Sequence, residues 1–200
     1  MTLPSLATIE QLHQRYAPTP AVLELVYTHC QIVRDIALQL IDTHHISVDR
    51  QLVEAGCLLH DIGVYTLFTA DGIERSDLHY ITHGIRGAEI LQREGLPAPI
   101  VRYADHHTGV GISKTDITSQ NLPLPVADYL AESTEERLVM YADKFHSKND
   151  PPCFNTHSYY RASLLRFGAD KQTAFDALTA EFGEPDLDPL IARYGHIVQT

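Results

Sequence analysis

The residues best suited to chemistry in this chain are histidines and aspartates that recur at separate places along it. The adjacent pair His60-Asp61 stands at the end of the apolar run LVEAGCLLHDIG. Its outlying partners are His29, His83, His106, His107 and Asp143. Imidazole and carboxylate ligands together suit Fe, Mn, Co, Ni or Zn better than they suit calcium. The sequence therefore predicts a metal centre that holds one or two divalent transition-metal ions.

Helical periodicity runs through nearly the whole sequence. Between about residues 21 and 44, apolar side chains recur every three or four residues, and His29 lies on that apolar stripe. Further helices are expected over about residues 6–16, 81–94, 98–107, 133–147, 156–167, 170–182 and 187–194. Residues 64–79 are expected to form a loop, and no segment has the pattern of a strand. The predicted fold class is therefore all-α.

A helix over about residues 48–61 would carry the central pair, with Ser47 as its N-cap and Gly63 as a left-handed C-terminal cap. In the last turn of such a helix, His60 and Asp61 can share an ion that lies beyond the helix end. The partial negative charge at a helix C-terminus also favours a cation there. The predicted site is therefore at the end of this helix.

Each outlying residue also has an ordinary structural role open to it. His29 on an apolar face could be a hydrogen-bonded core residue, and His83 could bond to the backbone at a helix start. Asp143, on the inner face of its helix, could pair with Arg102 or another cation. Taken together with the central pair, they are better explained by a shared cation, because an unpaired buried carboxylate is costly. The remaining histidines are expected to be ordinary surface or core residues: His13, His44, His45, His79, His146, His157 and His196.

Composition narrows the class of protein. The chain has 200 residues, 44% hydrophobic and 20% charged, as in an ordinary globular protein. We expect one domain over residues 1–200, with a metal-site core at about 20–147 and C-terminal helices at about 155–195. No apolar stretch is long enough to cross a bilayer, and residues 1–16 lack the pattern of a signal peptide.

Charge and cysteine content bear on partners and compartment. A net charge of -11 without a lysine or arginine cluster argues against extended nucleic acid as a partner. The net charge does not exclude a small phosphorylated substrate, because bound cations reverse the local electrostatic field. It does not exclude a homo-oligomer either. Cys30 and Cys57 lie in apolar runs, and with Cys153 they form no C-x-x-C motif. Reduced core thiols in a cytoplasmic protein are therefore expected.

The order His29, His60-Asp61, Asp143 resembles that of the HD-domain superfamily of metal-dependent phosphohydrolases, and LLHDIG is close to its usual wording. In that family the first histidine, the HD doublet and the last aspartate bind the first metal ion. The resemblance covers about residues 25–147. It implies a helical HD-domain bundle in which these four residues are ligands.

A second resemblance concerns the stretches THGIRGAEIL and HHTGVG. They look like the segment that supplies extra histidines in binuclear HD proteins, including HD-GYP phosphodiesterases. They also resemble the HTTG region of bacterial HD-domain dinucleoside tetraphosphate hydrolases. By this resemblance His83 and His107, with His106 as a further candidate, bind a second ion or the substrate phosphate, and Asp61 bridges.

The chain also departs from the family pattern. Many HD enzymes have a lysine at the position of Val64, and the Gly-Tyr-Pro tripeptide of the cyclic-di-GMP enzymes is absent. Hydrolysis of cyclic-di-GMP is therefore not expected. Four basic residues could contact phosphate, although solvation at the surface is the expected state of each: Arg86, Arg102, Lys144 and Lys148.

The resemblance implies hydrolysis of a phosphoester or phosphoanhydride, with a nucleotide as the expected substrate. Asp61, His83 and His107 are the expected catalytic residues, the two histidines as proton or hydrogen-bond donors if only one ion binds. Two alternatives stand beside this interpretation. One is a di-iron oxygenase of HD fold, which uses similar ligands. The other is a regulatory module that binds a nucleotide without turnover.

Overall fold

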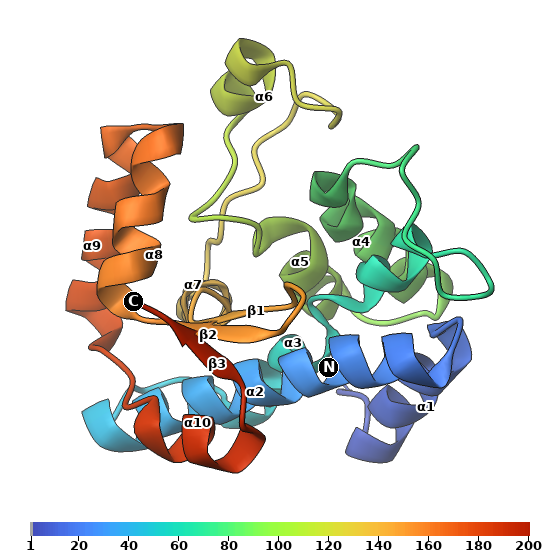
Figure 1. The fold of residues 1–200 in the computed structure, drawn as a ribbon, viewed down its shortest axis with the longest axis horizontal. Helices are drawn as coiled ribbons and strands as arrows, with labels where there is room; N and C mark the ends of the chain where they lie inside the picture. Colours follow the sequence, from blue (N-terminus) through green and yellow to red (C-terminus); the bar gives the residue numbers. More distant parts are fainter. Residues whose placement is uncertain (1) are drawn as a thin grey trace.

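The computed structural model describes residues 2–200 and consists mainly of helices (Figure 1). The α-helices are α1 (Leu6–Tyr16), α2 (Pro20–His44), α3 (Arg50–Leu59), α4 (His83–Arg93), α5 (Ala98–His106), α6 (Lys114–Gln120), α7 (Thr134–Asp143), α8 (His157–Ser163), α9 (Ala169–Phe182) and α10 (Asp188–Tyr194). Short 3-10 helices are η1 (Ile62–Leu67), η2 (Tyr80–Thr82) and η3 (Leu164–Phe167). The all-α prediction is confirmed, with one small sheet as an addition.

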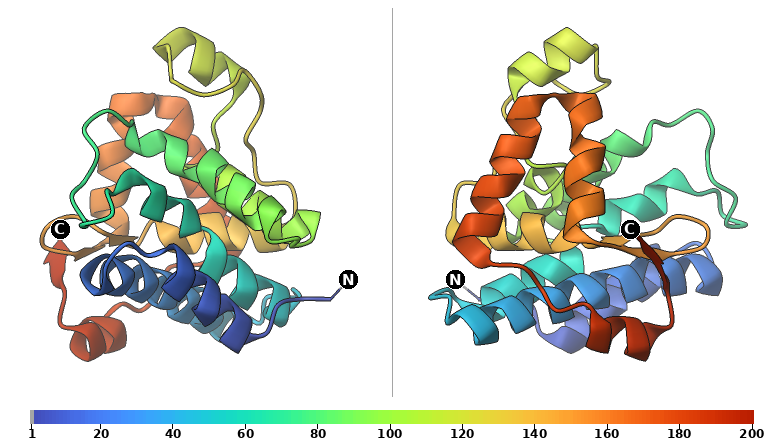
Figure 2. Two further views of the ribbon diagram at one scale, coloured as in Figure 1. Left: turned by 90° about the vertical axis from the view of Figure 1, so that its right-hand side faces the viewer. Right: turned by 60° about the vertical axis from the view of Figure 1, so that its left-hand side comes forward.

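Helix α2 is the long helix on which much of the core packs (Figure 1, Figure 2). It begins after Thr19, whose hydroxyl accepts a hydrogen bond from the backbone N–H of Val22 at 3.3 Å. Pro20 fits the first helical position because its missing N–H is not needed there. The buried stripe of α2 faces α3 and α7, and each buried valine or isoleucine contributes roughly 1.5–3 kcal/mol. His29 lies on this stripe, as its phase in the sequence predicts.

Glycines let three elements near the central His-Asp pair approach one another backbone to backbone. A Cβ atom on Gly63 in η1 would clash with the carbonyl oxygen of His83 and the backbone nitrogen of Gly87, both in α4. A Cβ atom on Gly84 of α4 would lie 2.8 Å from the carbonyl oxygen of Ala104 in α5. Since protein interiors are close-packed and leave no room for such an overlap, η1, α4 and α5 require glycine at these contacts.

Three expectations about local structure are wrong. Gly63 has no left-handed backbone and is needed for the close contact with α4. The N-cap of α3 is Asp49 in place of Ser47, and its carboxylate accepts two backbone N–H groups of the first turn at 3.0 and 3.1 Å. The expected loop at residues 64–79 begins inside η1, whose side chains are mostly buried.

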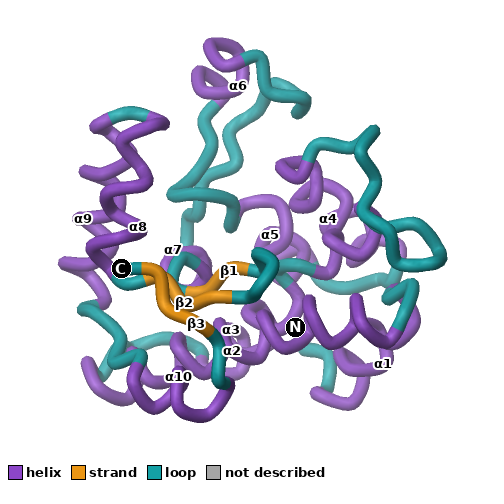
Figure 3. The backbone as a smooth tube through the Cα atoms, in the orientation of Figure 1, coloured by secondary structure: helices purple, strands orange, loops and turns teal. Residues whose placement is uncertain are grey.

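A small three-stranded sheet follows α7 (Figure 3). Strand β1 (His146–Ser147) pairs antiparallel with β2 (Cys153–Asn155), and β2 pairs in parallel with β3 (Ile197–Gln199). The strands have two or three residues each, too few for an alternation of apolar and polar residues to predict them. The helix expected to reach Ser147 ends at Asp143, and a turn at residues 144–145 leads into β1.

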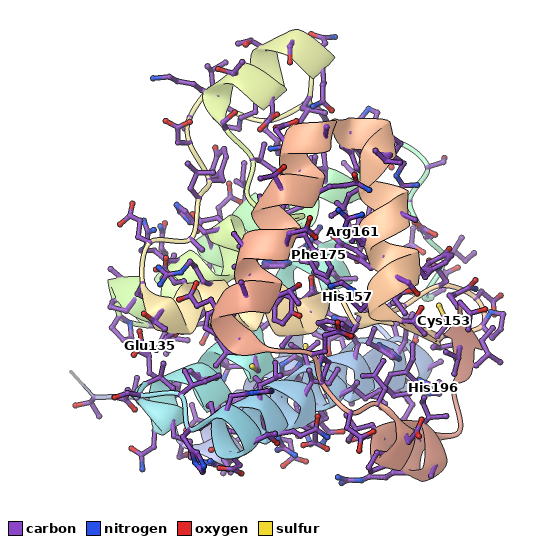
Figure 4. All side chains as sticks on the ribbon, turned by 90° about the vertical axis from the view of Figure 1, so that its left-hand side faces the viewer. Glu135, Cys153, His157, Arg161, Phe175 and His196 are labelled. Carbon is purple, nitrogen blue, oxygen red and sulfur yellow. The ribbon has the colours of Figure 1, made fainter. Side chains whose placement is uncertain are left out.

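The C-terminal helices α8 and α9 lie side by side, and α9 packs on α7 (Figure 4). Phe175 of α9 stacks on His157 of α8 with 5.1 Å between ring centroids, and it lies 5.4 Å from the ring of Tyr141 in α7. The hydroxyl of Tyr141 donates to the carbonyl oxygen of Gly183 at 2.8 Å. These contacts connect the C-terminal helices to the helix that carries Asp143.

The state of the cysteines and the lengths of the helices agree with what the sequence predicts. Cys30, Cys57 and Cys153 are all buried and free, as expected of core thiols. Burial raises the pKa of the Cys57 thiol. Within residues 2–200, every helix is too short or too polar to span a bilayer.

We expect Gly63→Ala to destabilise the fold and to disturb the predicted metal centre together. The added methyl group would meet three backbone atoms of α4, which cannot move aside as a flexible side chain would. Overpacking of this kind costs about 1–3 kcal/mol. Urea unfolding followed by circular dichroism measures the loss, and titration with Mn²⁺ measures the effect on metal binding.

Gly95→Ala is the matched control. Its φ of 74° makes alanine strained, but nothing lies within 4 Å of the added Cβ atom. This variant should lose stability and keep its metal affinity. Equal metal affinity in the two variants would show that the contact of η1 with α4 does not position the ligands.

Candidate metal centre

Four predicted ligands converge where α2, α3 and α7 meet. His29 comes from the middle of α2, His60 follows the last residue of α3, and Asp143 is the last residue of α7. One ligand atom from each of these, and one from Asp61, all lie within 4.8 Å of one another. Nε2 of His29 is 3.1 Å from Oδ2 of Asp61 and 3.0 Å from Oδ1 of Asp143. We call these four residues the first group.

The other oxygen of Asp61 faces a second group, formed with His83 and His107. His83 begins α4 and His107 follows α5. Oδ1 of Asp61 lies 3.3 Å from Nε2 of His83 and 3.4 Å from Nε2 of His107. These two nitrogens are 3.0 Å apart. Asp61 thus presents Oδ2 to the first group and Oδ1 to the second group.

Backbone carbonyls determine which ring nitrogen carries the proton. Nδ1 of His60, of His83 and of His107 each lies 2.7 or 2.8 Å from a backbone carbonyl oxygen. A carbonyl oxygen only accepts, so each Nδ1 donates its N–H. In the neutral rings the Nε2 lone pairs are therefore directed at the carboxylates.

In the second group a carboxylate oxygen faces imidazole lone pairs, so all the facing atoms are hydrogen-bond acceptors. A cation bound between them would satisfy these acceptors. Oδ1 of Asp61 is buried and has no hydrogen-bond partner among the described residues. The nitrogens nearest to it, Nε2 of His83 and of His107, carry lone pairs of their own. A buried unpaired carboxylate oxygen is costly, and metal-ligating histidines commonly donate their other N–H to a backbone carbonyl. The donor set therefore fits a bound divalent ion.

Burial and neighbouring charges keep His83, His107 and Asp61 in the protonation state that a metal ligand requires. Burial lowers the pKa of His83 to about 4 and also lowers the pKa of His107, so both rings are neutral near pH 7. Burial alone would raise the pKa of Asp61, but Lys148 holds it well below its usual value. Burial alone would lower the pKa of His60, but the carboxylate of Asp61 raises it. Positive charge is therefore favoured between His60 and the carboxylates.

Two lysines compensate the carboxylates. Lys144 is buried, and its Nζ lies 2.7 Å from Oδ2 of Asp143 and donates to the carbonyl oxygen of His107 at 2.9 Å. The side chain of Lys148 is 10% exposed and pairs with Oδ2 of Asp61. The prediction that both lysines are solvated at the surface is wrong, because each is held at a carboxylate that the fold buries.

His146, which was expected to be an ordinary surface or core residue, contacts the ring of His29 on the side opposite to Nε2. Nδ1 of His146 lies 2.9 Å from Nδ1 of His29, and its Nε2 lies 2.8 Å from Nδ1 of His196. His196 directly precedes β3, at the turn that leads out of α10 (Figure 4). If His29 binds an ion through Nε2, its Nδ1–H donates to His146, and His146 donates to His196.

The sequence places Lys144, His146 and Lys148 at every second position of KFHSK. In the structure Lys144 still has a helical backbone, a turn follows, and only His146 and Ser147 belong to a strand. The helix expected up to Ser147 did not include this turn, so the directions of the three side chains were not predicted.

Two other candidates lie outside both groups. His106 pairs with Asp105 and belongs to neither group among the described residues. Arg102 donates from Nε to Glu136 at 2.6 Å. The cation beside Asp143 is therefore Lys144, one of the other cations left open by the sequence, and Arg102 pairs with Glu136.

The HD domain family model matches residues 26–148 of this chain, which include both ligand groups and Lys148. The chain belongs to the HD domain family. The resemblance drawn from LLHDIG is thereby confirmed. Strands β2 and β3 and helices α8 to α10 lie beyond the matched residues of this HD domain protein.

Curated relatives resemble this HD domain protein over part of their length. One, named tRNA (cytidine(56)-2'-O)-methyltransferase, from Picrophilus torridus, is 40% identical over 124 residues, which are 62% of this chain and 32% of the relative. An uncharacterized protein from Methanocaldococcus jannaschii is 39% identical over 123 residues, 60% of this chain and 65% of the relative. The chain thus spans less than two thirds of either.

A solved structure shares the fold. The HD domain of the L. monocytogenes phosphodiesterase PgpH, in complex with cyclic-di-AMP, has a TM-score of 0.52 and 19% identity. The match covers 90% of this chain and 98% of that one. At this level of identity the likeness shows a common helical HD-domain fold.

We expect His107→Ala to lose much more bound metal than His106→Ala. His107 contributes Nε2 to the second group, whereas His106 is paired with Asp105 outside it. Removal of a ligand should weaken the second ion by at least about ten-fold, the lower end of what loss of a mere supporting partner costs. Metal content after dialysis, measured by plasma mass spectrometry, checks this. Wild-type content in both variants would refute the assignment.

We expect His146→Phe to weaken metal binding by about 10–100-fold, because it removes the acceptor that orients His29. His146→Gln, which keeps an acceptor oxygen, should recover part of the loss. Titration with Co²⁺, followed by its visible spectrum, reports both affinity and ligand geometry. His157→Phe is the matched control, since His157 packs on Phe175 away from the ligands. Equal losses in the Phe and Gln variants would mean that His146 only fills space.

Proposed function

We propose that this HD domain protein is a metal-dependent phosphohydrolase that cleaves a phosphoester or phosphoanhydride bond of a nucleotide. The observation that carries the proposal is the position of Asp61, with one carboxylate oxygen at each of two adjoining ligand groups. Divalent ions at such a centre lower the pKa of bound water and stabilise charge on a phosphoryl group. Fe, Mn, Co, Ni and Zn all suit these ligands.

The histidines of the second group are better suited to hold an ion than to donate a proton. Burial lowers the pKa of His83 to about 4, so this ring is rarely protonated near pH 7. Its Nδ1–H is already used at a backbone carbonyl, as is that of His107. What both rings offer to the site is a lone pair on Nε2. We therefore propose that the centre is binuclear, with His29, His60, Asp61 and Asp143 on one ion and Asp61, His83 and His107 on the other.

We assign Lys148 to the phosphate of the substrate. Its ammonium group lies at Asp61, and the residue lines the pocket in front of both groups together with Tyr80. An ammonium group can donate charge-assisted hydrogen bonds to phosphoryl oxygens. Lys148 would thus supply the positive charge that many HD enzymes place at the position of Val64.

Two findings favour a nucleotide as the substrate. A protein of the same fold is seen in complex with cyclic-di-AMP. The net charge of -11 without a basic cluster disfavours a long polyanion and leaves a small phosphorylated molecule as the simpler partner. The methyltransferase name belongs to a protein of which this chain spans about a third, so we do not extend that activity to this chain.

Metal analysis followed by a phosphate-release screen tests the proposal. Protein purified without chelators is assayed for bound metal, stripped with EDTA, and reloaded with Mn²⁺, Fe²⁺, Co²⁺, Ni²⁺ or Zn²⁺. The screen covers nucleotides, cyclic dinucleotides and dinucleoside polyphosphates. Turnover should vanish with EDTA and return with metal. Oxygen uptake by a mixed-valence di-iron form would favour an oxygenase, and nucleotide binding without turnover would favour a regulatory module.

We expect Asp61→Asn to remain folded, to hold less metal than the wild type and to lose at least about 100-fold in turnover. The amide keeps the shape of the side chain but removes the charge shared by both groups, which orients ligands and reactants. Circular dichroism, metal content and phosphate release measure the three effects. Asp105→Asn is the matched control, because Asp105 pairs with His106 outside both groups. Full metal content and full rate in Asp61→Asn would overturn the mechanism.

A further inference from the structure

A second cavity, of about 140 Å³, lies beside the pocket in front of the metal centre. We call it the side cavity. Thr108 and Gly109 line both the side cavity and the pocket that contains Asp61, His83 and His107. The side cavity is therefore within reach of a molecule whose phosphate lies at the metal centre.

The walls of the side cavity are largely apolar. Val110 and Ile112 come from the loop that follows α5, and Leu164 and Phe167 come from η3 on the other side. Ile112 and Leu164 are buried, whereas Phe167 is 48% exposed at the edge. An aromatic ring at the edge of an apolar slot suits a flat, weakly polar group.

The lining of the side cavity also includes three polar residues, Asp116, Gln120 and Lys171. Nζ of Lys171 pairs with Oδ2 of Asp116 at 2.7 Å and donates to the carbonyl oxygen of Gly111 at 3.1 Å. Asp116 also accepts hydrogen bonds from the backbone N–H and the hydroxyl of Ser113, again at Oδ2. Within residues 2–200 these bonds all use Oδ2, so Oδ1 remains an acceptor for a ring N–H. The amide of Gln120 adds a donor and an acceptor to the same lining.

The size and chemistry of the side cavity together point to one kind of group. Its volume of about 140 Å³ is below the roughly 300–1,000 Å³ typical of sites for a whole drug-sized ligand, so it suits a single ring system. A nucleobase has flat faces for the apolar walls and a hydrogen-bonding edge for the polar groups. We infer that the side cavity binds the heterocyclic base of the nucleotide substrate, an inference that rests on the proposed function.

The base site draws on a part of the chain beyond the HD family match. Leu164, Phe167 and Lys171 all follow residue 148, where that match ends. The metal ligands come from within it. The C-terminal helices would therefore determine which nucleotide is accepted, and the HD residues the bond that is cleaved.

The experiment uses the absence of tryptophan from this sequence. Phe167→Trp places a single fluorophore at the edge of the side cavity, and Leu165→Trp, at a 61% exposed position of the same turn, is the matched control. Both variants, stripped of metal to prevent turnover, are titrated with AMP, GMP, CMP and UMP, and with ribose 5-phosphate as a probe without a base. At least one nucleotide should change the emission of Phe167→Trp saturably. Ribose 5-phosphate should not, and Leu165→Trp should respond to neither.

A second variant tests the side cavity independently, because the tryptophan in Phe167→Trp could itself block it. Val110→Phe should fill the side cavity and weaken binding of the same nucleotide to the metal-loaded chain by about ten-fold in calorimetry, a typical effect for loss of base stacking. Binding of ribose 5-phosphate should be unchanged. Silent emission with all four nucleotides together with unchanged affinity in Val110→Phe would overturn the base site.

The outcomes separate this inference from the proposed function. If the metal-loaded chain hydrolyses nucleotides while Phe167→Trp stays silent and Val110→Phe binds normally, the base site is wrong and the phosphohydrolase stands. If Phe167→Trp responds to a nucleotide but no metal form releases phosphate, the cavity binds a base and the proposed reaction is wrong. Equal responses of both tryptophan variants would indicate nonspecific quenching and count against the base site.

Discussion

Two carboxylates in the interior, those of Asp61 and Asp143, impose the constraint on which this structure depends. Taking a carboxylate out of water costs several kcal/mol unless opposite charge accompanies it. Lys148 and Lys144 supply part of that charge, and the imidazoles around the carboxylates are drawn from both halves of the chain. A shift of any one contributing helix would leave a charge unpaired. The need to pair these buried charges costs free energy, and it also makes one arrangement of the helices more stable than the others.

Close backbone packing supplies the precision that this charge pairing needs. A ligand set works only when supporting residues hold it within about half an ångström of its geometry. Here Gly63 allows η1 to touch α4, and Gly84 allows α4 to approach α5. These are the elements that follow Asp61, carry His83 and precede His107. The second group is thus held by main-chain contacts, which are stiffer than contacts between long side chains.

Local patterns in the sequence predicted most of the helices and, through helix phase and the HD doublet, the residues of the first group. The roles of His83 and His107 were predicted from the resemblance to binuclear HD proteins. His29 lies on the apolar stripe of its helix, and His83 lies where a helix begins. Other features depend on partners far along the chain. His146 and Lys148 are directed to the site by an extended segment whose pairing with β2 gives no local signal. From the local sequence Gly63 has the pattern of a helix cap, but glycine is required there because its backbone contacts α4, some twenty residues later in the chain.

The parallel pairing of β2 with β3 has a consequence for the order of synthesis. The ligand residues, from His29 to Asp143, leave the ribosome before the segment that contains His196. Since domains form as the chain emerges from its N-terminal end, the helices can enclose the ligand set while His146 still lacks its outer partner. Docking of β3 then adds the contact between His146 and His196. The hydrogen bond that holds the ring of His146 behind His29 therefore comes from the residues of the site that are synthesised last.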